Sequence, residues 1–291
     1  MRKQYILLFA LLMLCLLPLS VWAQTEGDFV YSVIDGQARI TAYTGSAAEL
    51  TIPDTLGGYP VTAIGYCAFR NCTALAQVTL CESVSSIGSN AFQNCFSLSR
   101  ISLPGGLVSL GSHAFYGCSS LKQIALPDSL TRLHPYAFYG CSAIRSCGLD
   151  SRAALTLTSY GYAFTSPDYP QLALKAFEDE AGVRTFTVDD CDESAVAVSI
   201  PDGVTAIEGY AFCNCSSLAE LVLPDSVTEI AYFAFEGCSA LKQITLPGSV
   251  AQIADNAFSG CSGVTIISPA GSAAQALAQA HAEDGLAWRA L

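Results

Sequence analysis

The chain carries little charge and few of the side chains that enzymes commonly use. Of its 291 residues only 13% are charged, and histidine occurs three times. Acidic residues outnumber basic ones, which gives a formal charge of −12, and no stripe of Lys and Arg could follow a phosphate backbone. We therefore expect no nucleic-acid partner.

The sequence also lacks the motifs of common enzyme classes. It contains no G-x-S-x-G, H-E-x-x-H, P-loop or dinucleotide fingerprint. None of the histidines shares a repeat position with a nucleophile, so surface or capping roles fit them best; they are His113, His134 and His281. An enzyme would need a site within residues 148–190, where the clustered acids are Asp168, Glu178 and Asp179. We expect neither an enzyme nor a cofactor.

Apolar segments of membrane-spanning length are absent. The apolar run Ile6–Leu17 is too short for a span; it follows Arg2 and Lys3 and precedes the small residues of Val21-Trp22-Ala23. This pattern predicts a secretory signal peptide over residues 1–23, cleaved after Ala23, and no membrane span. Removal of its two basic residues would change the formal charge from −12 to −14. We expect a secreted or cell-surface protein.

In contrast, apolar residues and repetition are plentiful. Hydrophobic residues make up 52% of the chain, and Ala114–Cys118 returns letter for letter as Ala137–Cys141, 23 residues later. An Ala-Phe pair recurs with this period in two groups, at Phe69, Phe92, Phe115, Phe138, Phe212, Phe235 and Phe258. A cysteine stands three residues after each Phe, at Cys72, Cys95, Cys118, Cys141, Cys215, Cys238 and Cys261.

This period, with Leu or Ile at fixed offsets, predicts a leucine-rich-repeat solenoid. In Leu241–Pro247 the three aliphatic residues should point inward from a short strand, which Pro247 ends because proline has no N–H to donate. Strands of successive repeats should pair about 4.8 Å apart. The Ala-Phe pair should form a tight turn on the far side, with Phe filling the core. One repeat cannot cover its own apolar face, so neighbours must stack on it.

The full pattern L-x-x-I-x-L-P-x-S-V-x-x-I-x-x-x-A-F-x-x-C-S-x resembles the BspA-type leucine-rich repeats of bacterial surface and secreted proteins. Leu218–Ala240 follows it at nearly every position, and such repeats cover residues 49–147 and 194–266. The resemblance implies 23-residue repeats of short parallel strands and turns with few helices. It also implies a role as an adhesin or host-interaction protein, and it brings no catalytic residues.

Segments outside the repeats predict caps. Phe29–Ile34 and Gln37–Tyr43 should form a hairpin around Asp35-Gly36, and Leu172–Phe177 and Val183–Val188 a second one. A short capping helix should begin at Ser272. After the signal peptide we predict a hairpin N-cap (24–48), a first array (49–147), a closing cap with the second hairpin (148–193), a second array (194–266) and a C-terminal cap (267–291). The sequence leaves open whether the two tandem arrays stack continuously.

Thirteen cysteines in an exported chain would ordinarily suggest disulfides. The seven repeat cysteines form a column in which neighbours about 5 Å apart meet the distance for a bridge, but their parallel side chains are poorly aimed at one another. Cysteine also serves as a small buried hydrophobe. We favour a reduced, buried thiol ladder. The better disulfide candidates lie outside the column: Cys67, Cys81, Cys147, Cys191 and Cys213.

No metal site is predicted. Cys213-x-Cys215 has no second pair at zinc-ligand spacing. Asp189–Glu193 is acidic but lacks the alternating oxygen ligands of a calcium loop, so a solvated turn is favoured.

Two surfaces are candidates for binding a partner. Outward positions of the main strand form a mildly polar face, which includes Arg100, Lys122 and Gln123. Aromatic residues gather beside the Ala-Phe turn, at Tyr66, Tyr116, Tyr136, Tyr139, Tyr210, Tyr232 and Phe233. Tyrosine is enriched in interfaces. We expect Tyr116, Tyr136 and Tyr139 to lie about one repeat apart on one edge as a binding patch; packing along the turn column is the alternative.

The sequence therefore favours an exported, non-enzymatic binding or adhesion protein that presents its repeat surface to a protein or glycan. The alternative is a structural or self-assembling component of the cell envelope.

Overall fold

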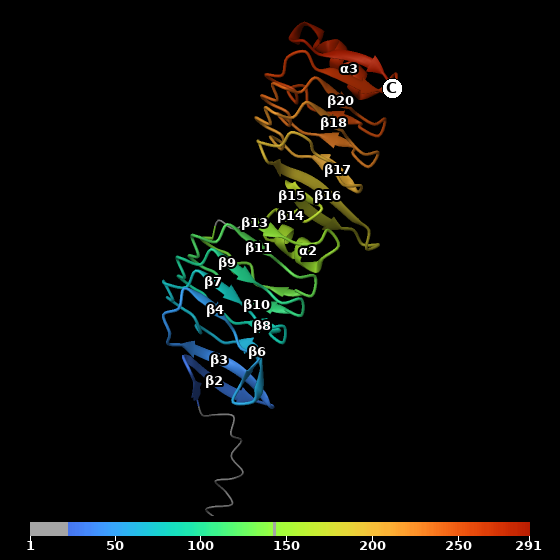
Figure 1. Cartoon of the computed structure of the whole chain (residues 1–291). Coiled ribbons are helices and arrows are strands. Elements are labelled where there is room, and N and C mark those ends of the chain that lie inside the picture. Colours follow the sequence, from blue (N-terminus) through green and yellow to red (C-terminus); the bar gives the residue numbers. More distant parts are fainter. Residues whose placement is uncertain (1–22, 142–143) are drawn as a thin grey trace, which may run out of the picture. The chain divides into compact units, whose positions relative to one another are not determined.

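The computed structural model describes residues 23–141 and 144–291 (Figure 1). The predicted signal peptide lies outside the described residues, except for Ala23. The chain divides into two compact units, Met1–Ala143 (unit 1) and Ile144–Leu291 (unit 2). Among the residues that the structure describes, no helix has the length and apolar character that a membrane span needs. The residue ranges predicted for the arrays and caps stay predictions.

Unit 1 begins with the predicted hairpin. Strands β2 (Phe29–Ile34) and β3 (Gln37–Tyr43) pair antiparallel, and β1 (Gln24–Glu26) pairs with β2. Asp35 and Gly36 between them have φ values of 51° and 72°. Two successive residues with positive φ are what a tight hairpin turn requires, and Asp-Gly accepts this conformation readily. The sequence thus located the N-terminal cap and its turn correctly.

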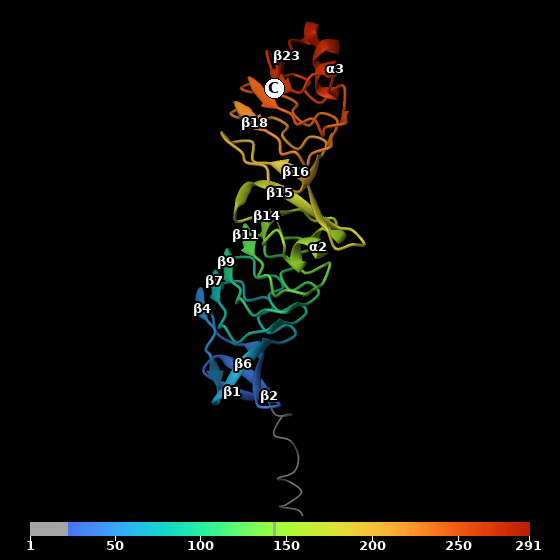
Figure 2. The same cartoon turned by 90° about the vertical axis from the view of Figure 1, so that its right-hand side faces the viewer.

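Two ladders of short parallel strands run through the repeats of unit 1. The first holds the predicted main strands β4 (Glu49–Thr51), β7 (Gln77–Thr79) and β9 (Arg100–Ser102), and β11 (Gln123–Ala125) takes the same place in the next repeat. These strands follow one another along one side of the unit (Figure 2). The second ladder joins β3 to β6 (Tyr59–Ile64), β8 (Ser86–Ile87), β10 (Ser109–Leu110) and β12 (Arg132–Leu133). A short strand β5 (Thr55–Leu56) pairs antiparallel with β6.

Unit 2 opens with β13 (Ile144–Ser146), helix α2 (Arg152–Ser159) and β14 (Phe164–Ser166). The Ser151 hydroxyl accepts a hydrogen bond from the Ala154 N–H and so caps the first turn of α2. The second predicted hairpin follows as β15 (Tyr169–Glu178) and β16 (Arg184–Cys191), which pair antiparallel. Both strands are longer than the sequence indicated.

The repeats of unit 2 again form two parallel ladders. One joins β18 (Glu220–Val222), β20 (Gln243–Thr245), β22 (Thr265–Ser268) and β23 (Ala287–Ala290). The other joins β16 to β17 (Val204–Ile207), β19 (Glu229–Ile230) and β21 (Gln252–Ile253).

Helix α3 (Ala273–Ala280) lies near the C-terminal end of unit 2, as Figure 1 shows, and a single 3₁₀ turn (Ala282–Asp284) follows it. Ser272 caps α3 by accepting from the Gln275 N–H, as predicted. The fold class predicted from the sequence, a leucine-rich-repeat solenoid with a hairpin N-cap and a short helical C-cap, is confirmed.

The core of each unit contains a column of phenylalanine rings. All seven Phe side chains of the Ala-Phe pairs are buried. Neighbouring rings stack nearly parallel, with centroids 5.0 Å apart for Phe69 and Phe92 and 5.2 Å apart for Phe212 and Phe235. Tyr43 of the N-cap hairpin continues the column of unit 1, 5.3 Å from Phe69. The cap therefore covers the end of the aromatic core as well as the end of the sheet.

A third set of backbone hydrogen bonds links the turns. The N–H of each Phe that has a further Ala-Phe turn one repeat later donates to the Ala carbonyl of that turn, at 2.8 Å from Phe92 to Ala114 and 2.8 Å from Phe235 to Ala257. These alanines are almost fully buried, so a larger side chain would have no space there. The turn thus joins neighbouring repeats by packing and by hydrogen bonds at the same position.

The cysteine column lies beside these turns. The Sγ of Cys95 donates to the Phe69 carbonyl at 3.1 Å, and the Sγ of Cys261 donates to the Phe235 carbonyl at 2.9 Å. Burial raises the pKa of the Cys95 thiol to about 12 and that of Cys118 further in the same direction. A thiol that stays protonated is a poor nucleophile for disulfide exchange. Cys95 and Cys118 are therefore suited to remain reduced.

The cysteines outside the repeat positions correct one expectation. Cys67, Cys81, Cys191 and Cys213, which the sequence made the better disulfide candidates, are free thiols in the structure. Cys81 is buried, and its thiol donates to the Val61 carbonyl at 3.6 Å. Cys191 is buried, and its Sγ donates to the same Asp192 carbonyl as the Sγ of Cys215, at 3.7 Å and 3.9 Å, so Cys191 lies beside the column of unit 2. It was missed because it stands at the end of a hairpin strand rather than after an Ala-Phe pair.

We predict that Phe235→Ala lowers the free energy of unfolding by about 3–5 kcal/mol, because it leaves a cavity inside the aromatic column. Phe177 is 45% exposed on β15 and provides a matched control in the same unit. Phe177→Ala should cost less than about 1 kcal/mol. Chemical denaturation of both variants measures this, and equal losses would contradict a packed column.

The thiol column predicts a loss of stability at alkaline pH. The folded state holds the Cys95 proton, whereas the unfolded chain releases it near the ordinary thiol pKa of 9.0. Stability from this group is therefore fully present below pH 9 and falls as the pH rises toward about 12. Cys95→Ala should reduce the fall in unfolding free energy between pH 8 and pH 11 by about 2 kcal/mol.

Cys67→Asn serves as the control for this titration. Cys67 is half-buried and has a φ of 56°, a conformation that Asn accepts. The fall in unfolding free energy between pH 8 and pH 11 should be smaller in Cys95→Ala than in Cys67→Asn. An unchanged profile for Cys95→Ala would show that the buried thiols do not carry the effect.

Candidate functional site

The Ala-Phe turn places its two flanking side chains outward. In consecutive repeats of unit 1 these flanks are aromatic on both sides of the pair: His113 and Tyr116, then Tyr136 and Tyr139. Because Ala and Phe point into the core, the four rings lie in two columns on the surface. With His134 they form a continuous group that we call the aromatic patch.

Ring contacts join every member of the aromatic patch. Tyr116 and Tyr139 stack with centroids 6.0 Å apart and an interplanar angle of 10°, about one repeat apart as expected. His113 contacts Tyr116 and Tyr136, each at 5.6 Å, and Tyr136 meets Tyr139 edge-on at 6.1 Å. His134 lies 5.7 Å from Tyr136. Contacts between rings, rather than ion pairs, therefore join the members of the aromatic patch.

Most of this surface is open to solvent. Tyr136 is 52% and Tyr139 is 56% exposed, while Tyr116 and His113 are half-buried. Phe96, 50% exposed, borders the patch, since its ring lies 3.7 Å from where a Cβ on Gly117 would stand. Exposed rings of this size lose contact with water when a partner covers them. The patch combines apolar faces with polar hydroxyl and imidazole groups.

Hydrogen bonds hold the two histidines in place. The Ser112 hydroxyl and His113 Nδ1 are 2.7 Å apart. His134 Nδ1 accepts from the Tyr136 N–H at 3.2 Å, which leaves its Nε2 to carry the proton of the neutral ring. Among the described residues, the hydroxyls of Tyr116, Tyr136 and Tyr139 bond to no protein group, so they remain available to a ligand.

The backbone of His113 adds a further feature. Its φ of 55° lies in the left-handed region, where the preceding repeat has Asn90. Asn tolerates this conformation well, whereas a bulky ring there costs free energy. The sequence thus places an aromatic side chain where a smaller residue would stabilise the turn better, and the ring faces the surface.

The polar strand face does not join the aromatic patch. Arg100 lies in β9 and Gln123 in β11, with Lys122 just before it, and all three side chains are exposed. They belong to the main-strand ladder, whereas the aromatic patch belongs to the turns that follow β10 and β12. The structure thus separates the six candidate residues into two surfaces.

The remaining aromatic residues fall into two places. Tyr66 is 68% exposed in unit 1, with no ring contact among the described residues. Tyr210, Tyr232 and Phe233 form a cluster in unit 2, with Tyr210 and Phe233 stacked at 5.3 Å. Only one flank of the Ala-Phe turn is aromatic in that unit, since Cys213 and Glu236 occupy the other. The densest group of exposed rings is therefore in unit 1.

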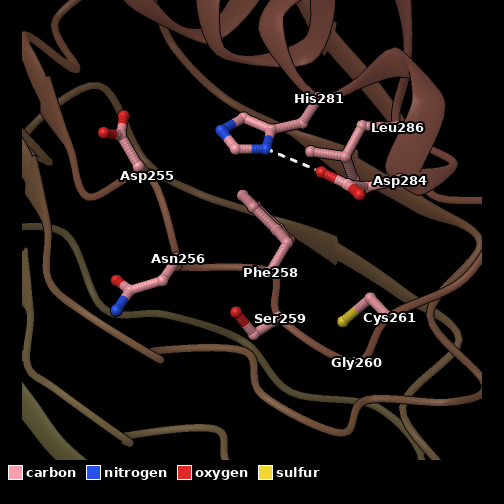
Figure 3. Close-up of a pocket in the computed structure, with 9 residues that line it drawn as sticks. All are labelled: Asp255, Asn256, Phe258, Ser259, Gly260, Cys261, His281, Asp284 and Leu286. Carbon is pink, nitrogen blue, oxygen red and sulfur yellow. Dashed lines mark hydrogen bonds and ion pairs between the residues drawn. The ribbon is translucent and has the colours of Figure 1, made fainter.

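The C-terminal cap of unit 2 contains a pocket of about 520 Å³ (Figure 3). It includes a serine, a histidine and a carboxylate, namely Ser259, His281 and Asp284. His281 Nδ1 lies 2.9 Å from an Asp284 carboxylate oxygen. Within the part of the chain that the structure describes, no hydrogen bond joins the Ser259 hydroxyl to the imidazole. Figure 3 shows the Phe258 ring between them. The serine therefore has no base to activate it, and His281 instead ends helix α3 as its C-cap.

The acidic residues of the insert do not converge on a site. Asp168 precedes β15, while Glu178 and Asp179 lie at its other end, about 30 Å away for a strand of this length. The Glu178 carboxylate pairs with Arg184 at 3.0 Å, and Asp179 Oδ1 accepts from the N–H groups of Ala181 and Val183. These acids stabilise the hairpin rather than form a catalytic pair.

The acidic run Asp189–Glu193 is also used locally. Lys175 forms an ion pair with Asp189, and Asp192 accepts two hydrogen bonds from Ser194, which lower its pKa. Burial raises the pKa of Asp190, whose carboxylate accepts from the Cys191 N–H. Within residues 23–141 and 144–291, no group of three or more His, Cys, Asp or Glu side chains is arranged to hold a metal ion.

Sequence reasoning identified the three tyrosines of the aromatic patch but missed His113, His134 and Phe96. The spacing of His113 and Tyr136 was the available signal, because both directly precede an Ala-Phe pair. Phe96 could not be found this way, since it follows the column cysteine and reaches the patch only through the turn geometry.

Comparison with known proteins bears on the fold. A family profile described as BspA type Leucine rich repeat region matches residues 41–165 and 185–279 with 6 copies. A search of curated proteins found no match. Similar solved structures include a leucine rich repeat protein of T. pallidum, which is 26% identical over 84% of this chain and 81% of that chain, with a TM-score of 0.36.

Two further solved structures are similar. A leucine rich cell surface protein from Faecalibacterium prausnitzii is 26% identical over 92% of this chain and 95% of that chain, with a TM-score of 0.35. A leucine-rich repeat protein from Bacteroides ovatus is 21% identical over 85% of this chain and 71% of that chain, with a TM-score of 0.48. The family profile spans well over half of the chain and confirms the resemblance seen in the repeats: this protein belongs to the BspA-type leucine-rich repeat family.

Proposed function

We propose that this chain is an exported, non-enzymatic binding protein whose aromatic patch contacts a protein or glycan partner. The observation that carries the proposal is the group of five mutually contacting rings on the surface of unit 1, of which Tyr136 and Tyr139 are more than half exposed. Burying such rings releases ordered water and provides large contact area with little loss of side-chain entropy.

Packing alone does not account for this surface. The Phe column inside the turn already fills the core, and the same turn forms in other repeats with small or polar flanks, such as Asn90 and Gln93. Tyr136 and Tyr139 contact each other edge-on, and each is more than half exposed. The rings are therefore dispensable for the turn, which supports a role in recognition.

Export is part of the proposal and rests on the sequence. The basic start, the short apolar run and the small residues before Ala23 support a cleaved signal peptide. The predicted site lies outside the described residues apart from Ala23. Intact-mass measurement of the protein recovered from the culture medium or cell surface would test cleavage after Ala23.

We predict that Tyr116→Ala combined with Tyr139→Ala weakens partner binding by at least about 2 kcal/mol, the size typical of aromatic hot spots. Loss of unfolding free energy should be much smaller than for a buried Phe, because Tyr139 is more than half exposed and Tyr116 is only half-buried. Affinity pull-down and glycan-array binding with the mature chain would identify the partner. Titration calorimetry would then measure the affinity of that partner for the unmodified protein and for the double variant.

Tyr66→Ala is the matched control, since it removes an exposed tyrosine of the same unit outside the aromatic patch. It should leave the affinity unchanged. Lost stability with intact binding in the double variant would mean that these rings serve packing, and the strand face at Arg100, Lys122 and Gln123 would become the site. Light scattering tests the structural alternative, since a self-assembling component would not remain monomeric.

A further inference from the structure

The charge of the chain is divided unequally between the two units. Unit 2 contains 18 Asp and Glu against six Lys and Arg, a formal charge of −12. Unit 1 contains seven of each, but Arg2 and Lys3 belong to the predicted signal peptide, so without that peptide five basic residues stand against seven acidic ones, a formal charge of −2. Most of the acidic excess therefore belongs to residues 144–291. The aromatic patch lies in the nearly neutral unit, so the acidic surface of unit 2 needs a separate explanation.

A groove of about 830 Å³ lies in unit 2, between the β17–β19–β21 ladder and helix α3. This volume is within the range of about 300–1,000 Å³ found for ligand sites. Its wall includes the ring of Tyr232, and its floor includes Ala276 and Ala280 on α3, both exposed. These apolar surfaces could cover the methylene stem of a long side chain.

Tyr232 is fixed in its place by a close contact. The ring lies against Gly209, where an added Cβ would come within 2.7 Å of the tyrosine Cζ. A residue with a side chain at position 209 would therefore displace the ring. Tyr210 meets Tyr232 edge-on with centroids 5.5 Å apart, so the wall of the groove continues into the aromatic cluster of this unit.

All charged side chains that line the groove are carboxylates: Glu208, Glu229 and Asp255. The ion pairs within the described residues are Lys175–Asp189, Arg184–Glu178 and His281–Asp284, so none of the three groove carboxylates takes part in one. Carboxylates and the face of a tyrosine ring both attract cations. The groove is thus complementary to a positively charged chain with aliphatic stems.

We propose that this groove binds a lysine- or arginine-bearing segment of another polypeptide. The ammonium or guanidinium groups pair with Glu208, Glu229 and Asp255, while their stems lie over the alanines of α3 and beside Tyr232. The site is separate from the aromatic patch and does not depend on the function proposed for it. The protein would then contact two chemically different surfaces, one through each unit.

The experiment uses the mature chain and the peptide Lys-Ala-Lys-Ala-Lys-Ala, with its fully acetylated form as an uncharged reference. Fluorescence anisotropy should show saturable binding of the charged peptide, which is lost at about 1 M salt because the screening length falls to about 3 Å. The acetylated peptide should not bind. Equal binding of both peptides would overturn the proposal.

Two triple variants locate the site. Glu208→Gln with Glu229→Gln and Asp255→Asn should weaken binding at least about ten-fold, the sum expected for three ion pairs at the surface. The control neutralises three exposed acids of the same unit that do not line the groove, by Glu180→Gln, Asp202→Asn and Asp225→Asn. It changes the net charge equally and should weaken binding less than about two-fold. Equal weakening by both would show a diffuse acidic field and contradict a groove.

A steric pair separates the groove from charge altogether. Ala276→Trp fills the floor and keeps every carboxylate, so binding should fall at least about ten-fold. Gln279→Trp adds the same ring to an exposed position of α3 outside the groove and should leave binding unchanged. Intact binding in Ala276→Trp would place the peptide elsewhere. Tyr116→Ala with Tyr139→Ala should not change the affinity for this peptide. The peptide experiment therefore tests the groove independently of the function proposed for the aromatic patch.

Discussion

The structure depends most on one backbone contact, the hydrogen bond from the Phe N–H of an Ala-Phe turn to the Ala carbonyl of the turn one repeat later. It occurs where the Phe ring stacks on its neighbour and where the column thiol donates to a nearby Phe carbonyl. Strand ladders alone would pair the repeats only at two places. The turn supplies the third, which explains why Ala, Phe and Cys vary so little while the residues around them change.

This constraint also explains where binding surfaces can arise. The turn requires that Ala and Phe point inward, so the residues directly before and after them face solvent. In unit 1 two consecutive repeats use these positions for His113, Tyr116, Tyr136 and Tyr139, and a patch of stacked rings results. In unit 2 the outer face of the second strand ladder, together with α3, forms a groove instead. The same repeat thus presents different chemistry without change to its core.

Much of the fold could be predicted because the pattern is local and periodic. The repeat fixed the inward residues, and Asp35-Gly36 and Ser272 marked a turn and a helix start through their own backbone preferences. The second strand ladder was not predicted, because two-residue strands such as Ser86–Ile87 are too short to show the alternation of apolar and polar residues that indicates a strand. Phe96 was missed because its surroundings come from a neighbouring repeat rather than from adjacent residues, whereas His113 could have been found from its place directly before an Ala-Phe pair.

Hydrogen exchange measured by NMR tests the central role of the turn most directly. If the Phe-to-Ala hydrogen bond links the repeats, the amide protons of Phe92, Phe115, Phe212 and Phe235 should be among the slowest to exchange in their units. The amides of Ala181 and Val183, which donate only to the Asp179 side chain at an exposed hairpin tip, should exchange far faster. Comparable exchange rates in the two groups would contradict the account.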